Sequence, residues 1–228
     1  MTHYVLVPGG FIDGRYWDGV AQRLEKAGHH VDVVDQLPSA GFDPSALGDL
    51  TTDAAAVRRR VEDAGEPVVL VGHSYGGMVI TELADHPDIA HSVYLAAAWP
   101  ARGQSMFDLF GGGPPPAWIA AQPDGTLRAT DDLQLLRDGL CADVEREQAE
   151  AELQRMLPQS LTSASTPSSA PARAHPTTYI VCEQDMTLRP AAQEQMAAAA
   201  DRVERLPSSH QPMLSMPDEL AAILARVS

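Results

Sequence analysis

The sequence predicts an α/β fold: a mostly parallel sheet with helices on both faces and a small, mainly helical cap insertion. Across residues 1–98, short β-branched runs alternate with helical stretches of about ten residues or more, and parallel strands need such crossovers. The strand runs are apolar without interruption, which is typical of a sheet covered on both faces. The alternation stops at residue 99 and resumes at residue 177. We therefore expect a core of residues 1–98 and 177–228 and a cap insertion with a linker at residues 99–176.

The first part of the predicted core holds four strands separated by three helices. In the first helix Trp17, Val20 and Leu24 recur at helical spacing on one face, and Gly28 stops the helix. The predicted strands are residues 4–7, 31–35, 67–71 and 92–96, and the predicted helices are residues 16–27, 45–64 and 75–84.

The insertion begins where this pattern ends. Residues 111–116 are a Gly/Pro breaker cluster, residues 131–157 have a mostly helical pattern, and residues 162–176 form a linker rich in Ser, Pro and Ala. No run between residues 99 and 175 has strand quality comparable to the core runs. The core then resumes with strands at residues 177–182 and 203–206 and helices at residues 191–200 and 218–227.

Charge and residue usage exclude several classes of function. With a net charge of -15, the chain would repel nucleic acids and anionic membranes. Lys26 is the only lysine, so Schiff-base chemistry has almost no candidate residue. Cys141 and Cys182 follow no metal spacing, and Cys182 ends an apolar run, where a buried, inert thiol is the usual state. We expect no metal and no organic cofactor.

The same features bear on location and assembly. No window approaches the roughly 18 apolar residues of a membrane span. The run Tyr4–Val7 is too short for a signal peptide and lacks a basic lead-in. Cysteines without a pairing pattern fit a reduced compartment, so we expect a cytoplasmic location. The sequence leaves the oligomeric state open, a homodimer included.

The stretch Gly72–Gly76, with the sequence GHSYG, carries the strongest chemical signal. It follows an apolar strand and opens a helix, which forces Ser74 into a tight strand-to-helix turn flanked by small residues. Its hydroxyl should then stand above the carboxyl edge of the sheet, where ligands bind in open α/β folds. We predict that Ser74 is a nucleophile. The alternative is a Ser-Gly turn without chemical function.

A serine nucleophile needs a base and an acid that orients the base. His210 is the best base, because it lies in a loop between the last short strand and the last helix. The other histidines are expected to be ordinary surface or core residues, and His73 to point elsewhere. Asp185, beyond the end of the strand at residues 177–182, is favoured as the acid. Glu183, closer to that strand, remains the alternative.

Two backbone amides should receive the negative charge that develops on the substrate during attack. One is the amide of Tyr75, the residue after the nucleophile. The other should come from the loop after the first strand, with Gly10 favoured and Phe11 as the neighbouring choice. Paired glycines in that loop also serve as a plain tight turn, so this prediction depends on Ser74.

Five stretches, spread over nearly the whole chain, match the motifs of one family in order. They are Leu6–Gly10 through Trp17, Val71–Gly77, Arg155–Leu161, Tyr179–Asp185, and Ser209–Ser215 into Pro217. Together they resemble the compact α/β-hydrolase branch that includes plant methylesterases, hydroxynitrile lyases and small bacterial esterases. The resemblance implies an α/β-hydrolase fold with nucleophile Ser74, acid Asp185 and base His210. This sequence departs from the family pattern at Pro8, where many relatives carry a histidine. It also departs at Gln211, where hydroxynitrile lyases carry a lysine, and this difference counts against cyanohydrin chemistry.

Aromatic residues are only 5% of the chain, and several gather near the start of the insertion. Their position there suggests an apolar acyl or alcohol pocket under the cap. The alternative for each is that it only packs the cap onto the core. The candidate lining residues, besides Tyr75, are Phe11, Trp99, Met106, Phe107, Phe110 and Trp118.

These residues lead to two classes of function. The first is a serine hydrolase that cleaves a small, fairly apolar carboxylic ester through an acyl-enzyme on Ser74. The same residues could also hydrolyse thioesters, lactones or C–C bonds, or act as a lyase. The second class is a ligand-binding module on a hydrolase scaffold, because a fold alone does not set function. The expected partner in either case is a small molecule.

Overall fold

The computed structural model of the chain describes residues 1–109 and 115–227. Within this part, the main sheet has six parallel strands in the order β2-β1-β3-β4-β8-β9. All of them come from residues 1–98 and 177–228, so the parallel sheet predicted from the sequence is confirmed. The strands are β1 (His3–Val7), β2 (His30–Val33), β3 (Val68–His73), β4 (Ile89–Leu95), β8 (Thr177–Cys182) and β9 (Arg202–Leu206).

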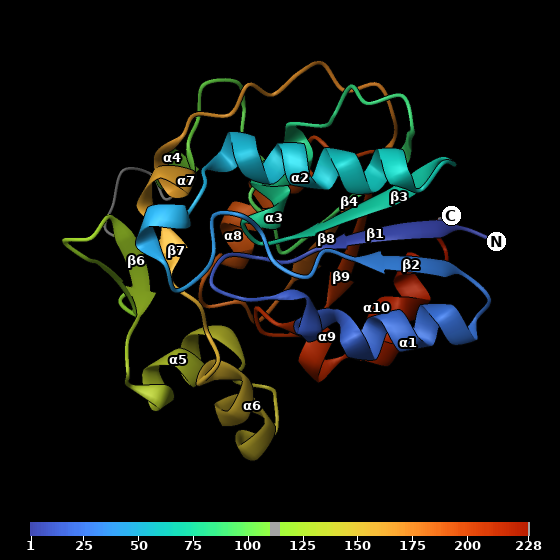
Figure 1. Cartoon of the computed structure of the whole chain (residues 1–228). Helices are drawn as coiled ribbons and strands as arrows, with labels where there is room; N and C mark the ends of the chain where they lie inside the picture. Colours follow the sequence, from blue (N-terminus) through green and yellow to red (C-terminus); the bar gives the residue numbers. More distant parts are fainter. Residues whose placement is uncertain (110–114, 228) are drawn as a thin grey trace.

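Helices cover both faces of the main sheet (Figure 1), and the buried side chains of the inner strands alternate between the two faces. In β1, Val5 and Val7 point to one face and Tyr4 and Leu6 to the other, and all four are fully buried. This burial on both sides explains why the inner strands are largely apolar, whereas the edge strands β2 and β9 also carry exposed polar side chains. The first face is covered by α2 (Leu50–Asp63), α3 (Gly76–Thr81) and α8 (Pro190–Ala197), and the second by α1 (Asp18–Lys26), α9 (Pro212–Ser215) and α10 (Pro217–Leu224).

Helix α2 begins later than the sequence predicts, and Asp49 is the reason. Its side chain accepts a hydrogen bond from the Thr52 amide at 2.9 Å, and the Thr52 hydroxyl accepts one from the Asp49 amide at 2.7 Å. This reciprocal capping box starts the helix at Leu50. The earlier turn is a separate 3₁₀ helix, η2 (Pro44–Ala46), so the single helix predicted for residues 45–64 was too long. The other 3₁₀ turn, η1 (Gly14–Trp17), precedes α1.

The helices and short strands from α4 to α7 lie beyond one end of the main sheet, away from both chain termini (Figure 1), and residues 166–176 return to the start of β8. Besides helices, this region contains a small antiparallel sheet in the order β5-β6-β7, which the sequence analysis did not predict. Strands of two to four residues are too short to show alternation, and they form only through pairing. Helix α7 also falls where a linker was expected. The elements are α4 (Met106–Leu109), β5 (Ile119–Ala121), β6 (Thr126–Ala129), α5 (Leu133–Leu140), α6 (Arg146–Leu153), β7 (Gln159–Ser160) and α7 (Leu161–Ser165).

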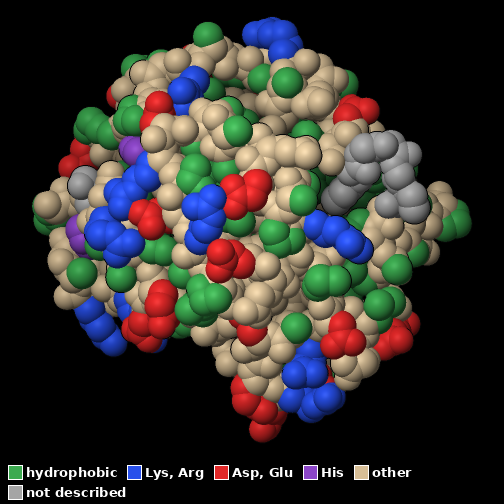
Figure 2. Space-filling view, turned by 180° about the vertical axis from the view of Figure 1, so that it is seen from behind, with side chains coloured by type: hydrophobic (Ala, Val, Ile, Leu, Met, Phe, Trp, Pro, Cys, Tyr) green, Lys and Arg blue, Asp and Glu red, His purple; other side chains and the backbone are tan. Residues whose placement is uncertain are grey.

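The surface seen from behind carries Arg and Lys side chains intermixed with Asp and Glu side chains (Figure 2). On this face the basic side chains form no continuous stripe of the kind that binds a phosphate backbone. Within residues 1–109 and 115–227, none of the helices combines the length and the apolar character needed to cross a membrane.

Both cysteines are free and buried, and we expect neither to react in the folded protein. Burial raises the pKa of the Cys141 thiol to about 12 and that of Cys182 well above its usual value. Because the thiolate is the reactive form, an aromatic disulfide reagent at about pH 8 should label neither residue in the native state and both after denaturation. Rapid native labelling that maps to Cys141 would show that the cap opens readily.

Candidate active site

Ser74 lies in the turn between β3 and α3 with a backbone φ of 51°, which is unusual for a residue other than glycine. The turn is possible because its flanking glycines lack side chains. A Cβ on Gly76 would stand 2.7 Å from the carbonyl oxygen of Pro8, and a Cβ on Gly72 would stand 2.7 Å from the carbonyl oxygen of Gly76. The Ser74 amide and carbonyl are both hydrogen-bonded to backbone at the end of β4. The surrounding strands therefore hold a strained turn that presents the hydroxyl.

A chain of hydrogen bonds joins three residues that the sequence analysis singled out. The Ser74 hydroxyl lies 2.9 Å from Nε2 of His210, and Nδ1 of His210 donates to Oδ2 of Asp185 at 2.6 Å. Asp185 is completely buried and His210 is 2% exposed. Glu183, the alternative acid, is exposed at the surface. The structure therefore brings together Ser74, His210 and Asp185 and leaves Glu183 outside.

The carboxylate of Asp185 is held from several sides. Its Oδ1 accepts from the amides of Thr187 at 2.8 Å and Leu188 at 2.9 Å, and its Oδ2 accepts from Nε2 of Gln193 at 2.9 Å. These bonds satisfy a charge that would otherwise be costly to bury, and they fix its orientation toward His210. Sequence reasoning missed Gln193, because nothing in a helical stretch marks one glutamine as an inward-facing partner.

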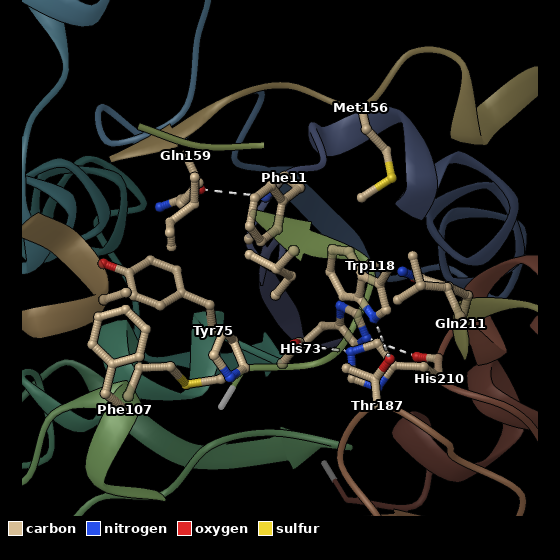
Figure 3. A pocket seen from close by; sticks show the side chains of 18 residues that line it. Phe11, His73, Tyr75, Phe107, Trp118, Met156, Gln159, Thr187, His210 and Gln211 are labelled. Atoms are coloured by element: carbon tan, nitrogen blue, oxygen red, sulfur yellow. Dashed lines mark hydrogen bonds between the residues drawn. The ribbon is translucent and has the colours of Figure 1, made fainter. Parts of the chain in front are cut away.

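The sequence analysis expected His73 to point away from the site, but its side chain points toward His210. Its Nε2 donates to the backbone carbonyl of His210 at 2.8 Å, and the two rings lie 4.8 Å apart (Figure 3). Burial, the largest cause, and the neighbouring His210 lower the pKa of His73 well below its usual value. The ring is therefore neutral and serves as a donor that holds the backbone of His210 in place.

The loop after β1 and the turn at Ser74 face each other. A Cβ built on Gly10 would lie 3.6 Å from the Cβ of Tyr75. The Phe11 amide donates to Oε1 of Gln159 at 3.3 Å. Among the described residues, the backbone amides of Gly10 and Tyr75 donate no hydrogen bond. The two amides are thus free to receive a substrate oxygen, while that of Phe11 is engaged.

A cavity of about 60 Å³ opens beside Ser74 and His210 (Figure 3). Since one water molecule needs roughly 10–15 Å³, the cavity has room for a few water molecules. Of the residues predicted to line it, Phe11, Tyr75, Met106, Phe107 and Trp118 do so. Lining residues that the sequence analysis missed include Leu127, Leu140, Met156, Gln159, Thr187 and Gln211.

Two of the predicted pocket residues have other outcomes. The prediction that Trp99 lines the pocket was wrong. Its ring stacks on that of Tyr94 with centroids 4.2 Å apart and packs against the main core. Trp99 follows the end of β4 by four residues, and the apolar surface nearest to it is formed by Tyr94 and Tyr179 of the sheet. Phe110 lies outside the described residues.

Comparisons with known proteins identify the relatives of this chain. A profile of the "Alpha/beta hydrolase family" matches residues 4–223. The chain belongs to the alpha/beta hydrolase family. This hydrolase is 30% identical to a carbendazim hydrolyzing esterase from Nocardioides sp., over 99% of both chains. The crystal structure of a pyrethroid hydrolase from Sphingobium faniae superimposes with a TM-score of 0.85 at 29% identity and covers 99% of this chain and 96% of that one. Methylesterase 8 from Arabidopsis thaliana is 34% identical over 43% of this chain and 38% of its own. The resemblance to methylesterases and bacterial esterases is thereby confirmed.

One group of potential metal ligands occurs among the described residues of the hydrolase: His3, His30 and Glu66. His3 is at the start of β1, whereas Ser74 follows the end of the parallel strand β3, so the group lies at the opposite end of the sheet from the site. His3 is already hydrogen-bonded to Asp32 at 2.9 Å and to Glu66 at 3.2 Å.

We expect the hydrolase to lose stability as the pH falls from about 6.5 to about 4. Burial is the main cause that lowers the pKa of His175 from 6.5 to about 4. Between these values the unfolded histidine binds a proton and the folded one does not, so the free energy of unfolding falls on acidification. His73 acts in the same direction. In thermal melts across this range, His175→Gln should show a shallower fall of Tm than the wild type. Parallel curves would contradict the assignment.

Proposed function

We propose that this hydrolase cleaves a small, fairly apolar carboxylic ester through an acyl-enzyme on Ser74. The observation that carries the proposal is the unbroken hydrogen-bond chain from the Ser74 hydroxyl through His210 to the buried Asp185. A serine, histidine and carboxylate in this order form the arrangement that activates a serine for acyl transfer. The relatives named above include proteins named as esterases.

The geometry supports a two-step mechanism. His210 accepts the proton of Ser74 as the hydroxyl oxygen attacks the ester carbonyl carbon. The resulting oxyanion is placed to accept hydrogen bonds from the amides of Tyr75 and Gly10, and removing one such donor typically costs about 3–4 kcal/mol of transition-state stabilisation. The C–O bond then breaks and the alcohol leaves with the proton from His210. A water, deprotonated by His210, attacks the acyl carbon and releases the acid, which restores Ser74.

The cavity supports a small substrate with apolar parts. Its lining side chains are mostly aliphatic, aromatic or thioether, and its volume is about 60 Å³. Trp118 and Phe11 meet edge to face with centroids 5.3 Å apart and form one wall. Thioesters and lactones offer the same carbonyl chemistry and fit the same residues. For lyase chemistry, Gln211 has no acidic proton comparable to that of a lysine ammonium group.

The experiment that tests the proposal is active-site labelling combined with a substrate series. A fluorophosphonate should modify the protein once, and mass spectrometry should place the adduct on the peptide that contains Ser74. Nitrophenyl esters of increasing acyl length should be hydrolysed with kcat/KM highest for short acyl chains, because the cavity is small. Saturable binding of the esters without release of nitrophenol would instead favour a ligand-binding module.

A further inference from the structure

A buried carboxylate, Asp53 of α2, lies behind the site and takes no part in the mechanism above. It is completely buried, and among the described residues it has no cationic partner. Its Oδ1 accepts from the Ser39 amide at 2.8 Å, and its Oδ2 accepts from the Ser39 hydroxyl at 2.5 Å and from the Tyr75 hydroxyl at 2.7 Å. Burial raises the pKa of Asp53, and these hydrogen bonds oppose that rise. Burying a charge that is stabilised only by neutral donors costs free energy, so we expect this carboxylate to have a role that offsets the cost.

The hydrogen bonds continue from Ser39 to the other side of the cavity. The Ser39 hydroxyl accepts from Nε2 of Gln159 at 2.6 Å, and the same nitrogen donates to the Ser163 hydroxyl at 2.8 Å. Oε1 of Gln159 accepts from the Phe11 amide at 3.3 Å. Gln159 is 3% exposed and Ser163 is completely buried. Asp53 therefore has two arms, one through Tyr75 and one through Ser39 and Gln159.

The two arms end on the two backbone segments that carry the proposed oxyanion amides. Tyr75 supplies one amide itself, and the Phe11 amide adjoins Gly10, which supplies the other. Figure 3 shows the Tyr75 hydroxyl and the Gln159 amide nitrogen on the same side, directed away from His210. Both segments need support, because Phe11 and Ser74 have φ values of 65° and 51°.

We propose that Asp53 is a positioning residue for the oxyanion hole: its two arms fix the separation of the Tyr75 and Gly10 amides. Asp53 is not among the residues that line the cavity, so it acts through Tyr75 and Gln159. This inference rests on the proposed ester hydrolysis. A misplacement of about 1 Å in such a site can cost roughly a hundredfold in rate.

The substitution Asp53→Asn separates positioning from simple electrostatics by the sign of its effect. A negative charge behind the site disfavours a developing oxyanion, so removing it without moving the amides would raise kcat. Asparagine keeps the shape of the side chain, but its amide nitrogen cannot accept a hydrogen bond. One of the two oxygens that Ser39 and Tyr75 need is thereby lost, and positioning predicts that kcat falls.

The experiment compares Asp53→Asn and Tyr75→Phe with Asp49→Ala. Asp49 caps the same helix, so its loss lowers stability without touching the two arms. The readouts are kcat and KM for a short nitrophenyl ester, the affinity for a trifluoromethyl ketone that forms a tetrahedral adduct on the serine, and Tm. We expect kcat to fall about ten- to hundredfold in the first two variants with KM changed less than about threefold. Ketone affinity should fall in step with kcat/KM, and Asp49→Ala should lower only Tm.

The proposal is overturned if Asp53→Asn keeps or raises kcat. It is also overturned if Asp53→Asn and Asp49→Ala lower Tm by similar amounts and kcat falls no more in Asp53→Asn than in Asp49→Ala. If Asp53→Asn does not fold, Tyr75→Phe decides the question, because it removes a single hydroxyl oxygen and leaves the Tyr75 amide in place. An unchanged kcat in Tyr75→Phe then sinks the idea. Failure of the proposed function itself would look different, because Ser74→Ala would retain ester hydrolysis.

Discussion

Replacing Ser74 with alanine is expected to lower kcat for ester hydrolysis on the order of 10⁶-fold and to abolish fluorophosphonate labelling. The hydroxyl oxygen is the only non-hydrogen atom removed, and it lies 2.9 Å from Nε2 of His210. Without it no acyl-enzyme can form. The amides of Tyr75 and Gly10 remain, so some rate enhancement over the uncatalysed reaction should persist. Initial rates with a short nitrophenyl ester measure the loss.

A second serine supplies the control. Ser92 is buried in β4, and its hydroxyl bonds to His175 at 2.7 Å, away from the cavity. Ser92→Ala should therefore lower Tm and retain both turnover and labelling. If Ser74→Ala turned over ester as fast as Ser92→Ala, a serine nucleophile at position 74 would be ruled out.

The next largest effect is expected from Asp185→Asn, with kcat lower by roughly 10⁴-fold and KM little changed. Asparagine fills the same space, but its amide group can donate to Nδ1 of His210 and so favour the wrong tautomer. It also lacks the charge that stabilises the imidazolium form during attack. KM should be insensitive, because Asp185 is buried and does not line the cavity. Steady-state kinetics over a range of ester concentrations separates the two constants.

Glu183 is the matched control for this carboxylate. It is two residues away and exposed, so Glu183→Gln should keep kcat within about twofold, as surface changes usually do. The reverse pattern, with Glu183→Gln inactive and Asp185→Asn active, would assign the acid to Glu183. Equal small losses in both variants would show that the imidazole of His210 is oriented without a carboxylate.

The elements that could be predicted from the sequence are those set by neighbours along the chain. Residues 177–182 were predicted as a strand and form β8 with the same bounds. A short, mostly apolar and β-branched run of this kind is typical of an inner strand that is buried on both faces of a sheet. The three short cap strands could not be predicted. β7 has only two residues, and it exists because it pairs with β6, a segment some thirty residues away in the chain.

The same distinction between local and distant interactions applies to the residues of the site. The Gly-His-Ser-Tyr-Gly turn is a local pattern, and the structure gives Ser74 the strained conformation that such a turn requires. The roles of other residues depend on distant contacts. His73 bonds to a carbonyl 137 residues away, and Gln159 reaches the Phe11 amide across 148 residues. No spacing along the chain carries that information.

By itself the sequence determined the parallel sheet, the turn at Ser74 and the short list of groups that could act with it, since each depends on periodicity or on residues within one turn. Only the tertiary structure decided that Asp185 is buried against His210 while Glu183 faces solvent, that Trp99 packs on the sheet, and that Asp53 bonds to Tyr75. The reason is physical. Whether a side chain is buried and which partner it meets are set by how distant segments pack, and not by the residues beside it.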